Sequence, residues 1–564
     1  IEGSGVEITD GDLTPIPADN TDFGSTALTG GTVVKTFTIY NTGDLALDLD
    51  GAPIVAISGT NAADFTVTTL PTTPVAITTG STTFEITFQA LKDIESGKDK
   101  ETLQLAKQFY NPENHTTKTP VIQNNDVNQS QKVAIEHILS DHSFSIIHGP
   151  PGTGKTHTIT QSIKHIRESK KSVLALAPSN AAVDNIAEKL MQIGLNVLRI
   201  GNPSKISEDL MQISLNEKIK SHPQYKLTKT LQKQADDFRK MSNQYKRKFG
   251  KEEREQRNAL RKEVKKIQYE IKQIEKHIKE TIWQEADVIC GTIMGAYKTW
   301  DKETKFDTVY LDEAGQALPT ESWLAATMGK KIIFAGDPQQ LPPTIFSDEA
   351  MAKGLNISLM ENWISKNKES QLLDIQYRMN EVIAGFSNNY FYNGLIKNAE
   401  NNKNHVIENN DFSPLEFIDT AGCDFNEEAL EAGSLINTGE ADIVSKIKND
   451  FENYSIGLIS PYRGQVVEIR KNTSELAQKD INTIDSFQGQ ERDVIIVSLV
   501  RSNNEQNIGF LKDYRRTNVA MTRARKKLIL IGDSATIGSD PFYNQLLDYV
   551  EQNGSYRSAW EFMG

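Results

Sequence analysis

A glycine-rich octapeptide between an apolar strand and a helix is the feature that most constrains the fold of this chain. The apolar run 144–148 precedes it, and a helix-compatible run over 156–167 follows it. In this setting the pattern G-x-x-x-x-G-K-[ST] predicts a loop whose backbone N–H groups, together with the helix N-terminus, bind phosphates. The lysine would reach the β- and γ-phosphates, and the last hydroxyl would ligate Mg²⁺. The predicted nucleotide-binding residues are Gly149, Pro150, Pro151, Gly152, Thr153, Gly154, Lys155 and Thr156.

An acidic pair further along the chain predicts the second half of an ATPase site. Asp312 and Glu313 directly follow the apolar run 308–311. Acidic pairs at strand ends are common, but one that lies downstream of a phosphate-binding loop has a defined task. Asp312 would hold Mg²⁺, partly through water, and Glu313 would polarise the water that attacks the γ-phosphate. The two motifs together predict an enzyme that hydrolyses ATP with Mg²⁺.

Two series of alternating strands and helices predict two parallel α/β lobes. The chain has 564 residues, which is too many for one core. We predict a helical linker or stalk over 91–127, a RecA-like lobe 1 over 128–350 with a helical insertion at 206–284, and a RecA-like lobe 2 over 351–564. The expected strands lie at 144–148, 173–177, 197–200, 288–290, 308–311 and 332–335, and then at 456–459, 481–484, 494–499 and 528–531.

The predicted insertion carries an apolar seam. Its members recur at spacings of four and three residues over three heptads, at Leu260, Val264, Ile267, Ile271, Ile274 and Ile278. Such a seam favours a helical hairpin packed on itself. The many lysines and arginines beside it leave open a basic arm that touches nucleic acid.

Residues 1–90 differ in composition from the rest of the chain. They hold twenty threonines and eleven acidic residues against the single Lys35, a net charge of −10, so the other 474 residues net −3 of the total of −13. Short alternating runs at 33–40, 54–58, 65–69 and 84–88 predict an all-β sandwich. This segment resembles the immunoglobulin-like repeats of bacterial surface proteins, the choice-of-anchor group. The pattern stops near 88–92, so the sandwich is expected to be incomplete, through a natural fusion, an engineered chimera or a sequence-assembly join.

Later motifs specify the kind of ATPase. Two motifs frame the phosphate-binding loop, at 128–131 (Asn-Gln-Ser-Gln) and 177–180 (Ala-Pro-Ser-Asn). Further motifs follow at 336–343 (Gly-Asp-Pro-Gln-Gln-Leu-Pro-Pro), 376–378 (Gln-Tyr-Arg), 485–491 (Asp-Ser-Phe-Gln-Gly-Gln-Glu) and 518–525 (Asn-Val-Ala-Met-Thr-Arg-Ala-Arg). In this order and spacing they resemble the motifs of superfamily 1B helicases, the up-frameshift and immunoglobulin-mu-binding type. The resemblance covers roughly residues 91–550 and implies two lobes that bind ATP between them.

The resemblance also implies a role for individual residues. Gln131 would read the adenine edge, Tyr377 would stack on the adenine, and Glu491 would contact the ribose. Gln340 would sense the γ-phosphate. Arg378 and Arg523 would reach across from the second lobe as arginine fingers, which stabilise the charge of the transferring phosphoryl group.

Strand binding is expected at the carboxyl ends of the parallel strands. The candidates are Ser179, Asn180 and Thr292 in lobe 1, and the stretch 461–465, with Pro461, and Ser486 in lobe 2. These residues would bind phosphate and sugar, without sequence preference. Closing and opening of the cleft would then move single-stranded RNA or DNA past the lobes, and the resemblance implies 5′ to 3′ movement. RNA and DNA both remain open as the substrate.

The composition favours a cytoplasmic, monomeric motor with no membrane partner. No run of 18 apolar residues is present, and two distant cysteines, Cys290 and Cys423, favour a reducing compartment. An ATPase that remodels ribonucleoprotein without unwinding is the alternative. An extracellular adhesion module is the reading that residues 1–90 alone would favour. A hexameric ATPase is disfavoured because this chain carries its own second lobe.

Overall fold

The protein is described here from a computed structural model. The structure describes residues 1–4, 6–8, 33–41, 46–49, 54–55, 65–75, 80–88, 100–110, 120–122, 126–243, 250–300, 302, 304–345, 351–352, 354–366, 369–408, 413–430, 433–473, 480–487 and 489–563. The chain divides into two compact units. One comprises residues 1–114 and 344–356, and the other comprises 115–343 and 357–564.

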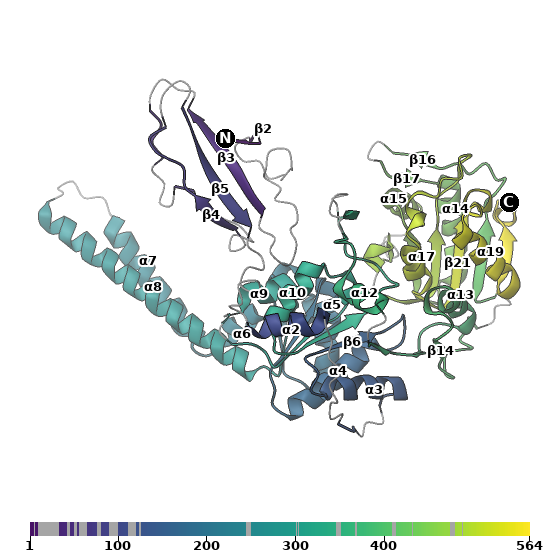
Figure 1. Ribbon diagram of the computed structural model, residues 1–564, viewed down its shortest axis with the longest axis horizontal. Helices are drawn as coiled ribbons and strands as arrows, with labels where there is room; N and C mark the ends of the chain where they lie inside the picture. The colour runs from purple at the N-terminus through teal and green to yellow at the C-terminus, as the bar shows by residue number, and fades with distance from the viewer. Residues whose placement is uncertain are drawn as a thin grey trace. The chain divides into compact units, whose positions relative to one another are not determined.

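The first unit contains a five-stranded antiparallel sheet. Its strands follow the order β2 (Val6–Glu7), β1 (Glu2–Gly3), β3 (Val33–Asn41), β5 (Gly80–Phe88) and β4 (Phe65–Thr69) (Figure 1). Three of the four predicted strands are therefore present, whereas the predicted strand 54–58 lies mostly outside the described residues. The described part of the unit forms one sheet, not the two facing sheets of a sandwich. A helix, α2 (Lys100–Tyr110), follows within the predicted stalk.

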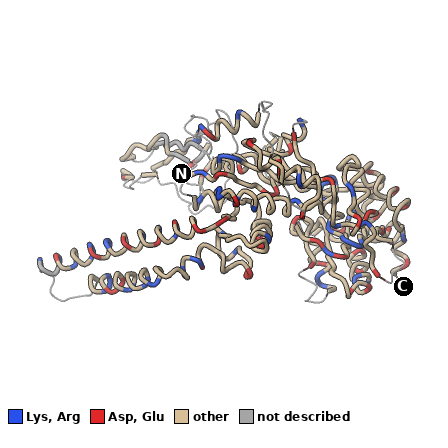
Figure 2. Tube along the Cα trace, turned by 90° about the horizontal axis from the view of Figure 1, so that it is seen from below, with Lys and Arg blue, Asp and Glu red and all other residues tan. Residues whose placement is uncertain are grey.

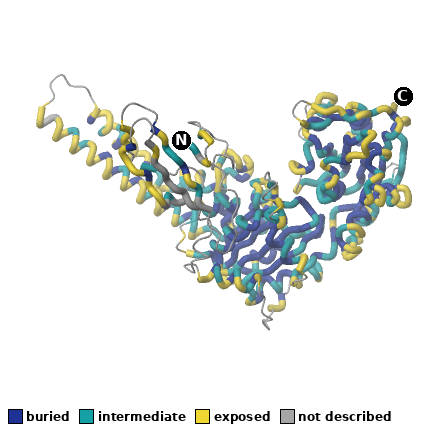
Figure 3. Tube along the Cα trace, turned by 45° about the horizontal axis from the view of Figure 1, so that its top comes forward, coloured by how far each residue is buried: buried dark blue, intermediate teal, exposed yellow. Residues whose placement is uncertain are grey.

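Lobe 1 is built on a seven-stranded parallel sheet. The order is β12 (Gln371–Leu372), β6 (Phe144–His148), β11 (Ile332–Gly336), β10 (Thr308–Leu311), β7 (Val173–Ala177), β9 (Val288–Thr292) and β8 (Val197–Ile200). The six predicted strands are present, and β12 adds an edge strand from a later part of the chain. The strands are buried between helices (Figure 3). These helices are α3 (Gln129–Leu139), α4 (Lys155–Glu168), α5 (Asn180–Gln192), α9 (Ile293–Thr299), α10 (Pro319–Thr327) and α12 (Leu359–Ser365).

The insertion in lobe 1 is helical. After α6 (Leu215–Ser221), helices α7 (Tyr225–Asn243) and α8 (Lys251–Glu285) run side by side (Figure 1). Ile267 and Ile271 of the apolar seam pack on Ala235, Leu231 and Phe238 of α7. Lysines, arginines and acidic residues alternate along both helices (Figure 2). The seam thus stabilises the hairpin itself, because burial of its apolar side chains occurs between the two helices.

Lobe 2 has a six-stranded parallel sheet. Its order is β19 (Ile481–Thr483), β18 (Ile456–Ser460), β20 (Arg492–Ser498), β21 (Ala524–Gly532), β15 (Leu415–Asp419) and β22 (Ser555–Ser558). The sequence predicted four of these strands and missed β15 and β22. The main helices are α13 (Glu381–Tyr392), α14 (Thr438–Ile447), α15 (Arg463–Lys471), α17 (Tyr514–Met521), α18 (Ser534–Ile537) and α19 (Pro541–Asn553). Two small strand pairs, β13 (Ile375–Gln376) with β14 (Lys397–Asn398) and β16 (Glu428–Ala429) with β17 (Leu435–Ile436), complete the unit. None of the described helices combines the length and apolarity needed to cross a bilayer.

Two glycines let the loops after β10 and β11 approach closely. A Cβ atom on Gly336 would lie 2.9 Å from the backbone nitrogen of Gly315 and 3.0 Å from that of Ala314. A Cβ on Gly315 would lie 2.9 Å from the carbonyl oxygen of Asp337. Because these neighbours are backbone atoms, they cannot rotate away. The absence of side chains at both positions therefore fixes the spacing between the acidic pair and the segment that begins at Asp337.

We expect Gly336→Ala to lower the free energy of unfolding of this unit by about 1–3 kcal/mol, because the added methyl group overpacks the contact between the two loops. Differential scanning calorimetry would measure the loss. Gly250→Ala is the control, because a Cβ there meets open space and the backbone φ is −98°. Equal unfolding temperatures for the two variants would contradict the packing argument.

Candidate functional site

The phosphate-binding loop joins β6 to α4. Gly152 and Gly154 adopt φ values of 75° and 78°, which L side chains rarely adopt. A Cβ on Gly152 would lie 2.7 Å from the Cβ of Arg378, and one on Gly154 would lie 2.7 Å from Nε2 of Gln131. The loop is thus enclosed by residues of other motifs. The hydroxyl of Thr153 donates to the carbonyl of Pro150 (2.8 Å), Pro151 is buried, and Thr156 is half-buried in the first turn of α4.

Lys155 lies between the two acidic residues of the second motif. Its Nζ is 2.9 Å from Oε1 of Glu313 and 3.4 Å from Oδ1 of Asp312. Burial opposes the positive charge, but the charges of Glu313 and Asp312 outweigh burial and raise the pKa of Lys155 above its ordinary value. Burial also raises the pKa of Asp312, although Lys155 opposes that change. The lysine therefore stays charged, and its ammonium lies between the two carboxylates.

Glu313 has a strained backbone. Its φ of 54° lies in the left-handed region, which is costly for a residue with a side chain. Its backbone N–H donates to Oδ1 of Asp312 (2.9 Å), and its Oε2 accepts from Nε2 of Gln316 (3.0 Å). The side chain remains partly exposed, at 21%. This conformation lets the carboxylates of Asp312 and Glu313 both reach Lys155. In a regular strand two adjacent side chains would point to opposite faces.

Gln131 and Tyr377 meet beside the loop. Nε2 of Gln131 donates to the carbonyl of Thr153 (3.0 Å), and its Oε1 accepts from the N–H of Asn128 (3.1 Å) in the cap of α3. The hydroxyl of Tyr377 accepts from Nδ2 of Asn128 (2.8 Å), and its N–H donates to the carbonyl of Gly152 (2.8 Å). The structure thus brings both predicted adenine contacts to one side of the loop. The Tyr377 side chain is exposed, whereas Gln131 is buried.

Arg378 is bound to Glu491 in this structure. Nε of Arg378 donates to Oε2 of Glu491, and Nη2 of Arg525 donates to the other carboxylate oxygen (2.5 Å). Burial opposes the charge of Glu491, but Arg378 and Arg525 hold the pKa of its carboxyl at about 2. Two residues with separate predicted roles, on the γ-phosphate and on the ribose, are therefore partners of each other here.

Arg523 is buried at the contact between the lobes. Its Nε donates to the carbonyl of Val519 (2.9 Å), and its Nη2 lies 3.4 Å from Oε1 of Gln340. Burial and the positive charge of Arg378 lower the pKa of Arg523 to about 9. Among the described residues, no carboxylate forms an ion pair with this guanidinium. The site therefore holds a buried cation that an anionic ligand would stabilise.

Asp337 is the centre of a buried hydrogen-bond network that the sequence analysis missed. Its carboxylate accepts from the hydroxyl of Tyr392 (2.7 Å), from Nε2 of Gln340 (3.0 Å) and, in one tautomer, from Nε2 of His148 (3.2 Å). Burial opposes the charge, but these donors hold the pKa of Asp337 below its usual range. The Tyr392 hydroxyl also accepts from Nδ2 of Asn518 (3.2 Å). The only sequence signal was the position of Asp337 beside Gln340, since Tyr392 belongs to no predicted motif.

The lobe 1 strand-binding candidates lie at the carboxyl ends of adjacent strands. Ala177 of β7 pairs with Thr292 of β9, so the residues that follow share one edge. Ser179 caps α5 by accepting from the N–H of Ala182 (3.2 Å), and Thr292 caps α9 by accepting from the N–H of Gly295 (3.3 Å). Oδ1 of Asn180 accepts from Nη2 of the buried Arg199 (3.0 Å).

The lobe 2 candidates are arranged in the same way. Ser460 of β18 pairs with Thr483 of β19, so Pro461 and Ser486 follow the ends of neighbouring strands. Ser486 is exposed and its hydroxyl accepts from that of Thr483 (3.1 Å). Gln488 of the same motif lies outside the described residues.

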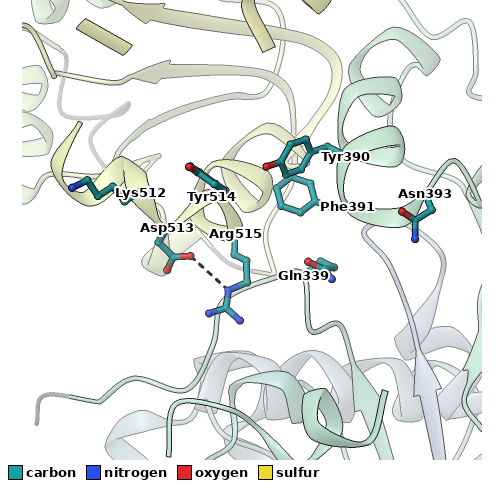
Figure 4. A pocket seen from close by; sticks show the side chains of 8 residues that line it. All are labelled: Gln339, Tyr390, Phe391, Asn393, Lys512, Asp513, Tyr514 and Arg515. Atoms are coloured by element: carbon teal, nitrogen blue, oxygen red, sulfur yellow. Dashed lines mark ion pairs between the residues drawn. The ribbon is translucent and has the colours of Figure 1, made fainter. Parts of the chain in front are cut away.

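A pocket lies where α13 and α17 of lobe 2 meet the segment after β11 (Figure 4). An ion pair crosses nearby, with Nη1 of Arg515 3.3 Å from Oε2 of Glu361 on α12. Nδ2 of Asn518 donates to the carbonyl of Gln339 (2.8 Å), which also joins the lobes. The pocket is lined by Gln339, Tyr390, Phe391, Asn393, Lys512, Asp513, Tyr514 and Arg515.

Comparison with known proteins matches the chain to two family models, each described as an AAA domain, over residues 126–348 and 355–535. An uncharacterised ATP-dependent helicase of Methanocaldococcus jannaschii is 34% identical, over 76% of this chain and 70% of its own length. DNA polymerase alpha-associated DNA helicase A of Saccharomyces cerevisiae is 32% identical, over 77% and 69%. DNA-binding protein SMUBP-2 of Mesocricetus auratus is 32% identical, over 79% of this chain but only 47% of its own length.

Among solved structures, the arterivirus nonstructural protein 10 (helicase) with DNA is 14% identical, covering 74% of this chain and 65% of that one. The TM-score of this match is 0.37. The family relationship therefore depends on the sequence relatives.

We expect Tyr392→Phe to lower the free energy of unfolding by about 1.5–3 kcal/mol, because it removes a donor to a buried carboxylate. Urea unfolding followed by circular dichroism would measure the loss. Tyr310→Phe is the matched control, since among the described residues the hydrogen-bond partner of that buried hydroxyl is the neutral hydroxyl of Ser162 (2.8 Å), and its loss should cost about 1 kcal/mol. A smaller loss for Tyr392→Phe than for Tyr310→Phe would contradict the charged network.

Proposed function

The chain belongs to the family of ATP-dependent helicases, and on that premise we propose that it couples ATP hydrolysis in the cleft between its two lobes to 5′–3′ movement along single-stranded RNA or DNA. Family members are enzymes that hydrolyse ATP and act on nucleic acid. The polarity, the residue roles and the substrate are the parts that we propose for this chain.

One observation carries the proposal. Lys155, Asp312 and Glu313 of lobe 1 lie together at the phosphate-binding loop, and Arg523 of lobe 2 reaches Gln340 of lobe 1. A γ-phosphate at this loop would be met by cations from both lobes. Lys155 would bind the β- and γ-phosphates and release Glu313, which would then orient the attacking water. Arg523 would stabilise the charge that spreads over the phosphoryl oxygens.

Thr156 and Asp312 have the chemistry that Mg²⁺ requires. Mg²⁺ prefers hard oxygen ligands and usually keeps waters and substrate phosphates in its shell, with one or two protein groups. A hydroxyl and a buried carboxylate fit that requirement, and no group of three metal-ligating acidic, histidine or cysteine side chains occurs among the described residues. When bound, the metal would neutralise charge on the β- and γ-phosphates. In this structure the ammonium of Lys155 supplies the positive charge beside Asp312.

ATP binding would change the partners of Arg378. Its guanidinium now binds Glu491, which a second arginine, Arg525, holds from the other side. A γ-phosphate would compete for Arg378 while Arg525 keeps Glu491 charged and placed for a ribose hydroxyl. Adenine would lie against Tyr377, with Gln131 behind the loop. The exchange of a carboxylate for a phosphate at Arg378 gives ATP different contacts in the open and closed cleft, which any ligand-driven closure requires.

Strand binding completes the motor. Ser179, Asn180 and Thr292 in lobe 1, and Pro461 and Ser486 in lobe 2, would bind phosphate and sugar at the carboxyl edges of the two sheets. Each lobe would then hold the strand separately, so closing and reopening of the cleft would move one grip relative to the other.

The setting of this motor is also a proposal. We infer a cytoplasmic monomer with a stalk at 91–127, lobe 1 at 128–350 with the insertion at 206–284, and lobe 2 within 351–564, where α12 and β12 return to lobe 1. The antiparallel sheet of residues 1–90 would be one half of an immunoglobulin-like sandwich. The all-β pattern of that segment and its described sheet support this inference.

We expect single-stranded RNA or DNA to stimulate ATP hydrolysis by the full chain, with the better activator identifying the substrate. Lys155→Ala should abolish hydrolysis because the phosphates lose their cation. Glu313→Gln should lower kcat by about 10²–10⁴-fold while ATP still binds. A coupled phosphate-release assay measures the rates, and strand displacement on tailed duplexes of both polarities tests unwinding. Unstimulated hydrolysis would contradict a strand-driven motor, and a 3′-tail preference would contradict the polarity.

We expect Arg523→Lys to lower kcat by about 10³-fold, because an ammonium cannot replace the planar guanidinium at the transferring phosphoryl group. Arg516→Lys is the control, since Arg516 forms only partly exposed pairs with Asp485 and Asp513. ATP affinity, measured with a fluorescent nucleotide, should change far less than kcat for Arg523→Lys. Equal kcat values for the two variants would show that Arg523 does not stabilise the transition state.

A further inference from the structure

Phe510 is an exposed aromatic residue between two buried anchors. Its side chain is 61% exposed, whereas Ile508 and Leu511 on either side are 3% and 2% exposed. A phenylalanine with this exposure leaves most of its apolar surface in water and so gains little from the core. Because its neighbours in the short turn Gly509–Lys512 are fixed in the lobe 2 core, the outward direction of Phe510 is fixed as well.

The segment that carries Phe510 is held by specific contacts. Its first residue, Val500, has a φ of 74°, which is strained for a β-branched residue, and its N–H donates to the buried carboxylate of Glu440 (2.9 Å). Arg501 pairs with Glu427 (3.1 Å) and donates to the carbonyl of Asn507. Strained backbone that the surroundings hold in place is concentrated at functional sites. These contacts therefore hold the loop 500–512 in one defined conformation.

Phe510 lies at the carboxyl edge of the lobe 2 sheet. Its ring contacts that of Tyr462, with centroids 5.4 Å apart, and its N–H donates to the Tyr462 hydroxyl (3.3 Å). Tyr462 directly follows Pro461 at the end of β18. Gly509 permits this approach, because a Cβ there would lie 2.7 Å from the Tyr462 hydroxyl oxygen. The exposed ring thus lies next to the carboxyl edge of the lobe 2 sheet, where we propose that the nucleic-acid strand binds.

Two basic residues are close in sequence to the contact between Phe510 and Tyr462. Lys512 and Arg463 are both exposed, Lys512 two residues after Phe510 and Arg463 next to Tyr462. In Figure 4 the side chain of Lys512 points away from the other labelled residues. Single-stranded nucleic acid is bound by this combination of basic groups that contact phosphates and an aromatic face on which a base stacks, whatever its sequence.

We propose that Phe510 is a base-stacking platform, and that the loop 500–512 binds the single strand through it. This inference rests on the proposed function, and it adds a base contact to a set of candidates that otherwise contact phosphate and sugar. Stacking would hold one nucleotide against lobe 2 without selecting its identity.

Fluorescence anisotropy of the full chain with labelled 15-nucleotide oligo(dT) and oligo(rU) tests the proposal. We expect Phe510→Ala to weaken binding by about 5- to 100-fold, and Phe510→Tyr to restore it. The slope of log K against log salt should stay unchanged, because stacking releases no counterions. Trp560→Ala is the matched control, since Trp560 is 60% exposed but follows β22, the edge strand on the far side of the sheet from β18 and β19.

A strand with abasic sites in place of its bases separates stacking from a loosened loop. Wild type and Phe510→Ala should bind that strand equally. Equal binding of the oligonucleotides that carry bases, a changed salt slope, or the same loss on the abasic strand would each overturn the role of Phe510 while leaving the proposed function in place. Failure of the wild-type chain to bind any strand would overturn both.

Discussion

The nucleotide cleft depends on one buried positive charge. Lys155 is enclosed by protein, and an ammonium there is tolerable only because Asp312 and Glu313 lie within 2.9–3.4 Å of it. The repulsion between the same two carboxylates is in turn offset by the positive charge of the lysine. The strained backbone of Glu313 and the glycine contacts at Gly315 and Gly336 hold this cluster in place. When ATP and Mg²⁺ bind, the phosphates would pair with Lys155, and the metal would pair with Asp312. The contacts among the protein's own charges would thus be exchanged for contacts with the ligands.

Buried polar groups join the two lobes, and Leu341 of the segment after β11 also packs into the apolar core of lobe 2. Asp337 accepts from Tyr392, Asn518 donates to Gln339, and Arg523 approaches Gln340. Hydrogen bonds of this kind are specific in geometry and modest in net free energy. An interface of this kind can open and re-form between defined arrangements, as a motor requires. The network also joins the end of β6, through His148, to the second lobe, so the strand before the phosphate-binding loop is linked to the arginine-bearing lobe.

The proposed strand binding rests on parallel-sheet geometry. In both lobes the candidate residues follow the carboxyl ends of neighbouring strands, where Ser179 and Ser486 are exposed. Phosphate and sugar contacts from caps give affinity without sequence preference. Phe510 adds an aromatic face at that edge of lobe 2. The proposed grip, which combines phosphate and sugar contacts with one stacked base, would hold a nucleotide in place without reading its hydrogen-bonding edge.

The sequence by itself predicted the two parallel sheets, ten of their strands, and the glycine-rich loop between β6 and α4. Those features are local, since a strand, a glycine loop and a helix N-terminus act within about 30 residues of one another. Only the tertiary structure decided which distant residues become partners. The pair Arg378–Glu491 spans 113 positions, and Asp337–Tyr392 joins a motif to a residue outside any motif. It also decided the edge strands β15 and β22, whose pairing is set by their neighbours, and the exposure of Phe510, because burial depends on what packs on a residue and not on its type.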